Sequence, residues 1–164
     1  MTYKLAFANI LVTRQKRHHM QIKCPHCTKK NRFPIEKVGA NPKCGACHNS
    51  LLTEPIILNQ SNIDEVISQH ILPVIIDFWA PWCGPCKNFA PTFKTSAAQF
   101  VNQVIYAKVD TEAEQMLGAK YNIRSIPTLA YFWQGKELGR VSGALPENQL
   151  NELVLKVIKA TKSL

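Results

Sequence analysis

Hydrophobic and polar positions are arranged differently in the two parts of this chain of 164 residues. Beyond residue 53, short apolar runs alternate with segments that have a helical pattern of apolar positions. Short apolar runs are typical of buried strands, and a helical pattern is typical of amphipathic helices. Between residues 20 and 52, large apolar side chains are too few for an independent core. The pattern therefore predicts one core-forming domain preceded by a small module.

The apolar pattern of the larger part predicts an α/β fold. Strands are expected at residues 55–58, 74–79 and 104–109, a hairpin at 128–133 and 137–141, and helices at 61–70, 83–100, 112–121 and 146–160. Ser61 is a candidate helix N-cap, Pro91 is expected to kink the second helix, and Pro146 falls in the first turn of the last one. Strand–helix–strand followed by a hairpin and a helix predicts a mixed central sheet flanked by helices.

The charge is as uneven as the hydrophobic pattern. The net charge is +9, and residues 1–50 hold ten lysines and arginines against one acid, whereas residues 51–164 hold ten against ten. A basic surface can bind nucleic acid or another anionic surface, but this one lacks interleaved aromatic residues. We therefore favour a solvated basic module and do not expect nucleic acid as a partner. No window of about 18 apolar residues is present, so we expect no transmembrane helix and no membrane partner.

Six cysteines form three C-x-x-C pairs, and the first two pairs lie in the basic module. Their arrangement is C-x2-C-x16-C-x2-C, a spacing expected for a four-cysteine zinc site. Four thiolates leave no open position on the metal, so such a site is structural. Zinc binding, worth about 10–16 kcal/mol in comparable small modules, would supply the stability that the few apolar residues cannot. The expected ligands are Cys24, Cys27, Cys44 and Cys47.

Other uses of these four cysteines stay open on sequence alone. Each of these two pairs would form a tight turn, or knuckle, that directs two thiolates inward. A rubredoxin-like iron site has similar knuckles, although electron transfer by iron would duplicate the redox function of the third cysteine pair. Two disulfides in place of a metal are disfavoured in a reducing compartment. A nucleic-acid-binding ribbon would use the lysines and arginines around the knuckles. His26 and His48 lie beside the cysteines, and with four thiolates available we interpret both as bystanders.

The third pair, Cys83 and Cys86, closely follows the apolar run of residues 74–79 and opens the second predicted helix. This layout is typical of a dithiol redox centre, because the two sulfurs can close a small disulfide ring. At the start of a helix, free backbone N–H groups and the positive end of the dipole favour a thiolate. Cys83 is therefore the candidate nucleophile and Cys86 the candidate resolving thiol. An inert structural disulfide is the disfavoured alternative.

One acid, Asp77, lies inside the apolar strand that precedes this pair. Burial of a carboxyl group is costly unless the group is paired or neutral. Strand alternation places Asp77 on one face, beneath the start of the helix that carries the cysteines. A buried carboxyl group with a raised pKa suits proton transfer near neutral pH.

The run from Asp77 to Lys87, which reads DFWAPWCGPCK, closely resembles the thioredoxin family. The resemblance extends from about residue 54 to the C-terminus, and the two upstream cysteine pairs resemble the zinc-containing thioredoxin-2 subgroup. It implies a thioredoxin fold preceded by a zinc-ribbon-like module. It also implies a protein-disulfide reductase, recycled by thioredoxin reductase, with a role in the oxidative-stress response. From the cysteine spacings and the lack of a convincing export signal, we expect a reducing cytoplasm. No glycine-rich cofactor motif is present, so we expect zinc but no organic cofactor, and electrons must come from a partner.

The resemblance also implies roles for residues near the cysteines. Asp77 would transfer a proton to or from the thiol of Cys86, and Lys108 would be the partner of this acid. On its own, Lys108 would be interpreted as a solvated strand residue. The dipeptide Gly84-Pro85 would tune the stability of the thiolate, and proline at its second position is similar to the reducing members of the family.

A second set of residues is implied in substrate binding. The bond between Ile126 and Pro127 matches the family's cis-proline, which faces the cysteines and leaves a backbone edge for an extended substrate chain. A flat apolar patch would surround the reactive sulfur. Trp82 belongs to this patch by resemblance, whereas Trp79 is interpreted as the structural tryptophan. The implied substrate-binding residues are Trp82, Gly84, Pro85, Ile126, Pro127 and Gly143.

We expect three segments: an N-terminal extension without a structural role at residues 1–19, a zinc module at 20–52 and a thioredoxin domain at 53–164. In the extension the apolar run precedes most of the charge, which is the wrong order for a secretory signal. The expected partners of a monomer are thioredoxin reductase and disulfide-containing proteins. In an alternative function, the basic zinc ribbon recruits protein or RNA and the dithiol acts locally. A third hypothesis, suggested by the subgroup resemblance, is that oxidation of the ribbon releases zinc.

Overall fold

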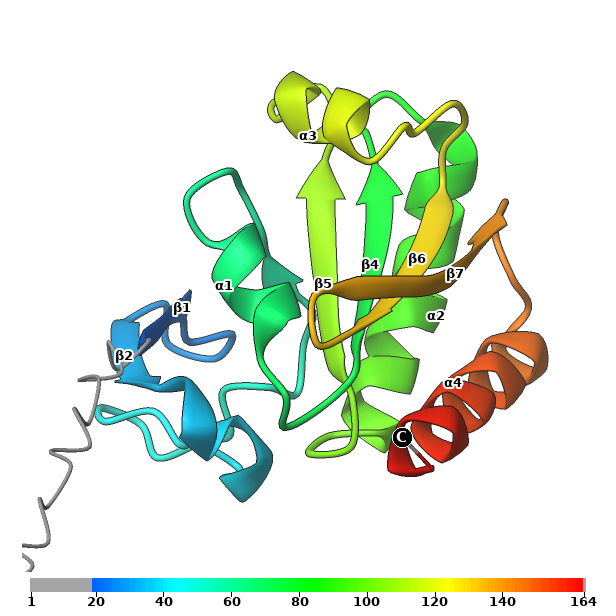
Figure 1. Cartoon of the computed structure of the whole chain (residues 1–164). Coiled ribbons are helices and arrows are strands. Elements are labelled where there is room, and N and C mark those ends of the chain that lie inside the picture. The colour runs from blue at the N-terminus through cyan, green and yellow to red at the C-terminus, as the bar shows by residue number, and fades with distance from the viewer. Residues whose placement is uncertain (1–18, 164) are drawn as a thin grey trace, which may run out of the picture.

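A mixed five-stranded sheet forms the centre of the computed structural model, which describes residues 19–163 (Figure 1). Across the sheet the order is β3 (Ile56–Ile57), β5 (Ile105–Asp110), β4 (Val74–Trp79), β6 (Thr128–Trp133) and β7 (Lys136–Ser142). Strand β5 pairs in parallel with both β3 and β4, whereas β6 is antiparallel to β4 and β7 is antiparallel to β6. This is the mixed α/β sheet that the apolar pattern predicts.

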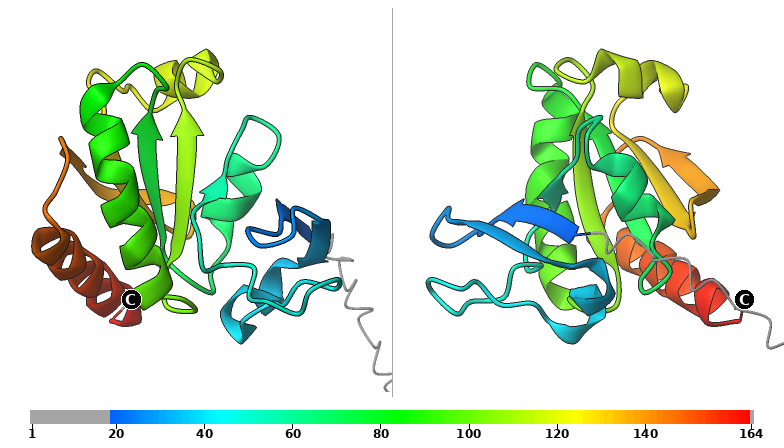
Figure 2. Two further views of the ribbon diagram at one scale, coloured as in Figure 1. Left: turned by 180° about the vertical axis from the view of Figure 1, so that it is seen from behind. Right: turned by 60° about the vertical axis from the view of Figure 1, so that its left-hand side comes forward.

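Helices cover both faces of the sheet (Figure 1, Figure 2). They are α1 (Ile63–Ser68), α2 (Gly84–Gln99), α3 (Gln115–Lys120) and α4 (Glu147–Lys162). Because successive side chains of a strand point to opposite faces, β4 contributes to two separate cores. Ile75 packs with Phe93 of α2 and Val154 of α4, whereas Ile76 packs in a second cluster with residues of α1 and α3. Helices α2 and α4 therefore share one face of the sheet, and α1 and α3 share the other.

The two short helices begin later than expected, for local reasons. Helix α1 begins at Ile63, because Ser61 does not cap it: the serine hydroxyl instead donates to Oδ1 of Asn59 at 2.6 Å. Helix α3 begins at Gln115, because two preceding amides donate to Oδ1 of Asp110 at 2.9 and 3.2 Å and form a turn there. Both starts are thus set by hydrogen bonds that a side-chain oxygen accepts from groups nearby in the chain, and such bonds compete with helix formation.

The two long helices lie close to their expected positions. Helix α2 continues through Pro91, although proline has no amide to donate to the carbonyl one turn earlier. Helix α4 begins directly after Pro146, so this proline precedes the first turn instead of lying within it. Its buried side chains recur at helical spacing and face the sheet: Leu150, Val154, Val157, Ile158 and Thr161.

The N-terminal module packs beside α1 and β3 (Figure 2). It contains the antiparallel strands β1 (His19–Lys23) and β2 (Lys30–Pro34), followed by the 3-10 helix η1 (Ile35–Ala40). Met20 and Val38 are buried in the same hydrophobic cluster as Ile56 of β3 and Ile63 of α1. The few apolar residues of the module therefore share a core with the larger part of the chain.

The expected N-terminal extension lies outside the described residues, except for His19, which begins β1 opposite Pro34. Across residues 19–163, no helix is long and apolar enough to cross a membrane. The C-terminal helix α4 ends the described chain beside α2, where Ser96 donates to Oδ1 of Asn151 at 2.8 Å.

Candidate functional site

The junction between β4 and α2 carries the third cysteine pair. The chain turns after β4, where the amide of Cys83 donates to the carbonyl of Ala80 at 3.1 Å. Cys83 is the N-cap of α2, and its sulfur accepts a hydrogen bond from the amide of Cys86 at 3.2 Å. A disulfide joins the two cysteines, whose Cα atoms lie 5.3 Å apart. Cys83 is 4% exposed and Cys86 is 0% exposed, so only the first cysteine borders the surface.

Two loops from the other half of the sheet meet this disulfide. The peptide bond between Ile126 and Pro127 is cis, and the carbonyl oxygen of Ile126 lies 3.8 Å from Sγ of Cys83. The amide of Gly143 donates to the carbonyl of Pro127 at 2.8 Å, and its φ of +96° suits glycine. Trp82, next to Cys83 in the chain, is 69% exposed. The structure thus gathers around the disulfide the residues expected to bind substrate: Trp82, Gly84, Pro85, Ile126, Pro127 and Gly143.

Asp77 is fully buried on the face of β4 that α2 covers, because Ile75, two residues earlier, packs in the α2 cluster. Its register partner on β5 is Lys108, whose Nζ lies 3.3 Å from Oδ2. No residue in the described part of the chain donates a hydrogen bond of good geometry to either carboxylate oxygen. Burial raises the pKa of Asp77 to about 6, and the nearby charge of Lys108 opposes this rise. The group can therefore exchange a proton near neutral pH.

Trp79 has a contact that the sequence analysis did not anticipate. Nζ of Lys108 lies 4.5 Å from the centre of the Trp79 ring, and this lysine side chain is 14% exposed. The ammonium group is thus held between the Asp77 carboxylate and an aromatic face, a favourable position for a cation. Strand alternation is the sequence signal that could have predicted this contact. Asp77 and Trp79 are two residues apart on β4, so they share the face on which Lys108 lies opposite Asp77.

The four cysteines of the N-terminal module converge on one point. Their sulfur atoms all lie within 4.8 Å of one another, and none of the four is in a disulfide. Two sulfur pairs, Cys24 with Cys47 and Cys27 with Cys44, are each separated by 3.6 Å. Thiolates bound to zinc at about 2.3 Å lie about 3.8 Å apart in a regular tetrahedron. The arrangement therefore fits a closed four-thiolate zinc site.

The two histidines beside the knuckles point elsewhere. Nε2 of His26 lies 3.4 Å from Oγ1 of Thr53, and His48 is exposed. Within residues 19–163, the side chains grouped closely enough to hold a metal ion are the four cysteines alone. The expected ligand set is thus brought together without a histidine.

Two family models match the sequence of this chain. The model described as Thioredoxin matches residues 54–156, and the one described as Thioredoxin 2, N-terminal, matches residues 23–49. The chain belongs to the thioredoxin family. It is a protein-disulfide oxidoreductase, as thioredoxins are, and its thioredoxin fold carries the zinc-ribbon module of the thioredoxin-2 type. Both resemblances noted in the sequence are confirmed.

Relatives of this thioredoxin come from several organisms. It is 49% identical over 134 residues to "Thioredoxin C-3" of Corynebacterium nephridii, covering 81% of this chain and 92% of the relative. It is 35% identical over 103 residues to a thioredoxin of Haemophilus influenzae, covering 63% of this chain and 96% of the relative. A solved mutant thioredoxin from Halobacterium salinarum has a TM-score of 0.59 at 34% identity, covering 65% of this chain and 92% of that structure.

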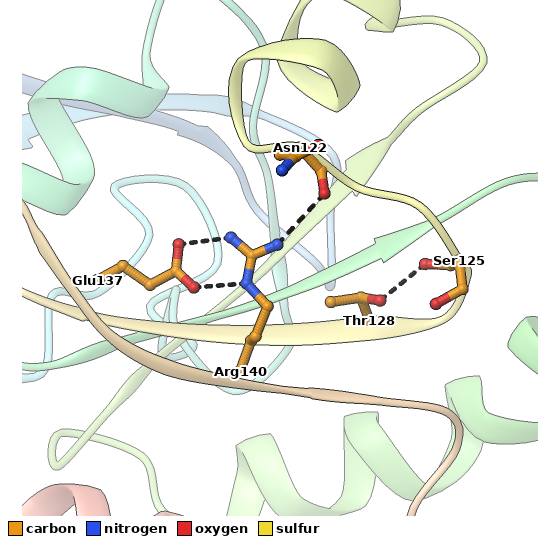
Figure 3. A network of polar contacts seen from close by, with 5 residues as sticks. All are labelled: Asn122, Ser125, Thr128, Glu137 and Arg140. Atoms are coloured by element: carbon orange, nitrogen blue, oxygen red, sulfur yellow. Dashed lines mark hydrogen bonds and ion pairs between the residues drawn. The ribbon is translucent and has the colours of Figure 1, made fainter.

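A second group of polar residues, around the loop that carries the cis-proline, was missed by the sequence analysis. It is drawn in Figure 3 and consists of Asn122, Ser125, Thr128, Glu137 and Arg140. These residues come from the loop after α3 and from the hairpin of β6 and β7. The residues on β6 and β7 could have been paired by counting the register of the hairpin outward from its turn. The path of the loop after α3, however, leaves no periodic pattern in the sequence.

Proposed function

We propose that this thioredoxin reduces protein disulfides through Cys83 and Cys86 and that thioredoxin reductase returns the pair to its dithiol form. The observation that carries the proposal is the position of Cys83 at the N-terminus of α2, bordering the surface and beside the cis-proline loop. A backbone amide directed at the sulfur and the positive end of the helix dipole both stabilise a thiolate there. The buried Cys86 cannot meet a target first.

The reaction has two exchange steps. In the first, the thiolate of Cys83 attacks one sulfur of the target disulfide, a mixed disulfide forms, and the second target sulfur leaves as a thiolate. In the second, Cys86 loses its proton and its thiolate attacks Sγ of Cys83. The mixed disulfide breaks and the target leaves with both sulfurs reduced. Two electrons pass to the target, and the protein ends in the disulfide form that the structure contains.

Asp77 is suited to accept the proton that Cys86 loses in the second step. Its carboxyl group is buried on the face of β4 beneath α2, whose first turn carries Cys86. A pKa of about 6 leaves the carboxylate mostly ionised at pH 7 yet basic enough to take up a proton. Lys108 acts as a positioning residue, because it holds the carboxylate and favours its ionised form.

The cis-proline loop supplies a place for the target chain. Neither backbone group of Ile126 makes a backbone hydrogen bond with another residue of the described chain. An extended target segment can therefore pair with this edge in the manner of an added strand. The exposed ring of Trp82 and the open surface over Gly84 offer apolar contact around the reactive sulfur.

The N-terminal module is proposed to hold a structural zinc ion. Bound to the four thiolates, zinc would link the two knuckles and stabilise the fold of the module. A reducing compartment such as the cytoplasm would keep these thiolates available, and we propose that location. A role in oxidative stress and the recruitment of RNA or protein by the basic ribbon stay predictions, since no contact in the described residues favours either.

Trapping of the mixed disulfide tests the proposed mechanism. With Cys86→Ser, attack by Cys83 proceeds but resolution fails, so a covalent complex with insulin should accumulate that dithiothreitol dissolves. With Cys83→Ser no complex should form, and the wild-type protein should turn over with NADPH and thioredoxin reductase. Full turnover by Cys86→Ser would contradict the two-step mechanism, and a complex with Cys83→Ser would contradict the choice of nucleophile.

A further inference from the structure

A polar pocket of about 360 Å³ lies beside the cis-proline loop, and Figure 3 shows the polar contacts of several residues that line it. Arg124 and Ser125 precede the cis bond between Ile126 and Pro127 in the chain, and Thr128 follows it. Ser142 directly precedes Gly143. The pocket is therefore continuous with the two loops that meet the disulfide. Its lining residues are Asn122, Arg124, Ser125, Thr128, Arg140 and Ser142.

The pairing of β6 with β7 explains why these side chains meet. Thr128 lies opposite Ser142, and Ala130 lies opposite Arg140. Residues directly opposite each other in an antiparallel pair share a face, and so do residues two apart on one strand. Ser142 and Arg140 therefore project from the same face as Thr128. The loop after α3 passes over this face, where the hydroxyl of Thr128 donates to the carbonyl of Ser125 at 2.7 Å.

Arg140 is held in a fixed orientation at one end of the pocket. Its Nε and Nη2 donate to the two carboxylate oxygens of Glu137 at 2.6 and 2.7 Å, and Nη1 lies 3.5 Å from the carbonyl oxygen of Asn122. Glu137 is not among the residues that line the pocket, so its carboxylate neutralises Arg140 from outside. The planar guanidinium group keeps further N–H donors for a ligand.

Arg124 brings a charge that no carboxylate balances. Its contact in the described part of the chain is a long hydrogen bond of 3.4 Å from Nε to Oδ1 of Asn122, and none of the described ion pairs includes it. The hydroxyl groups of Ser125 and Ser142 donate to no residue within 19–163. The lining thus has one uncompensated positive charge and several donors, but no carboxylate.

We propose that this pocket binds a carboxylate side chain of the protein substrate, beside the disulfide that is reduced. The proposal rests on the proposed reductase function and adds a preference for targets with an acidic residue near the reactive cysteine. A carboxylate accepts hydrogen bonds only, so it complements a lining of arginine and hydroxyl donors. The pocket adjoins the cis-proline edge, so a target segment that pairs at Ile126 would deliver its side chains there.

Matched disulfide peptides test this preference. Each peptide pair carries either glutamate or glutamine at one position within four residues of the reactive cysteine, and kcat/KM for reduction by the full-length protein is measured for both. We expect a preference of about fivefold for glutamate at one or two neighbouring positions, the size typical of a partly exposed ion pair. Arg124→Gln should raise KM for the glutamate peptide and so abolish the preference, which is measured as the ratio of the two kcat/KM values.

Two controls separate the pocket from the general charge of the protein. Lys136→Gln removes the same charge from an exposed position on β7 outside the pocket and should keep the preference. The double variant Arg140→Gln with Glu137→Gln keeps the net charge of the protein and should weaken the preference for glutamate. The pocket assignment is wrong if no position shows a preference, or if Arg124→Gln and Lys136→Gln reduce it equally. Reduction of the glutamine peptide shows that the reductase function itself is intact.

Discussion

The C-x-x-C motif adopts two different structures in this chain. In both knuckles of the zinc module, the residue after the second cysteine is left-handed, with φ of 62° at Thr28 and 59° at His48. Its amide donates to the carbonyl of the first cysteine at 2.9 Å in one knuckle and 3.0 Å in the other. The chain then reverses, and the amide of the first cysteine donates back to the residue five positions on at 2.8 Å in both.

The redox motif starts in the same way and then differs. The amide of Lys87 donates to the carbonyl of Cys83 at 3.1 Å, which is the same bond between the fifth residue and the first. Lys87, however, lies within α2, so the chain continues as a helix. The two sulfurs stay at the helix N-terminus and bond to each other instead of meeting a second knuckle. The backbone conformation directly after the motif therefore distinguishes the cysteine pairs suited to bind a metal from the pair that forms a redox-active disulfide.

Exchange of the first cysteine should separate the two motif types most strongly. Cys83→Ser removes the nucleophile, so insulin reduction should fall by a factor of about a thousand or more. Cys44→Ser removes a zinc ligand instead, and it should lose bound zinc while turnover per folded molecule stays within about twofold. Insulin reduction rates and zinc content by native mass spectrometry give both readings. Loss of turnover in Cys44→Ser with zinc still bound would contradict the separation.

Removal of zinc should loosen one face of the molecule and spare the other. The module shares its core with α1 and β3, whereas α2 packs in the cluster on the opposite face of β4. Chelation should therefore lower hydrogen-exchange protection in β1, β2 and α1 by several kcal/mol. Protection in β4 and α2 should change little, and turnover should persist. A uniform loss across all of these elements would show instead that the two parts unfold together.

Asp77→Asn should stabilise the oxidised protein, and the gain should depend on pH. The folded-state pKa of about 6 lies above the ordinary value of 3.8, so the folded state binds more protons between these values. Stability of the wild type therefore falls as pH rises from about 4 to about 6 and stays lower above that. The variant lacks this loss, so it should be more stable by about 3 kcal/mol at pH 8 and equal near pH 3.

Urea unfolding of both proteins across this pH range measures the effect, with Lys108→Met as a comparison. Because Lys108 opposes the rise in the pKa of Asp77, its removal should move the midpoint of the pH dependence upward. The same Asp77→Asn protein should resolve mixed disulfides more slowly than it forms them. Equal slowing of both steps, or a stability difference that does not vary with pH, would count against a titrating carboxyl group in this position.

Periodic features of the fold could be predicted from the sequence. The buried strand β4, the helix that follows the cysteines and the hairpin turn at Gln134 lie where the apolar pattern places them. The starts of α1 and α3 could not be predicted, because they are set by hydrogen bonds that the side-chain oxygens of Asn59 and Asp110 accept, and these bonds leave no periodic trace. The core shared by the module and α1 was also unforeseen, since contact between distant apolar residues depends on packing.

The residues of the functional site also divide into those that the sequence predicted and those that only the structure revealed. Cysteine spacing and an acid in an apolar strand predicted which side chains carry chemistry, since both signals lie in short stretches of sequence. The contact of Lys108 with Trp79 and the pocket around Arg140 need the register of neighbouring strands as well. The left-handed residue after the first knuckle was equally hidden, because a β-branched residue such as Thr28 rarely adopts a positive φ.

Glycine placed directly after the motif should affect the two motif types in opposite directions. His48 is left-handed at φ 59°, a conformation that costs an ordinary residue about 1 kcal/mol, so His48→Gly should stabilise the zinc-bound module by up to that amount. Lys87 lies in α2, where glycine is a poor helix former, so Lys87→Gly should destabilise the redox domain by about 1 kcal/mol. Both side chains are exposed, which keeps packing out of the comparison. Thermal unfolding of the zinc-loaded proteins measures the two shifts, and shifts of the same sign would mean that the residue after the motif does not decide its structure.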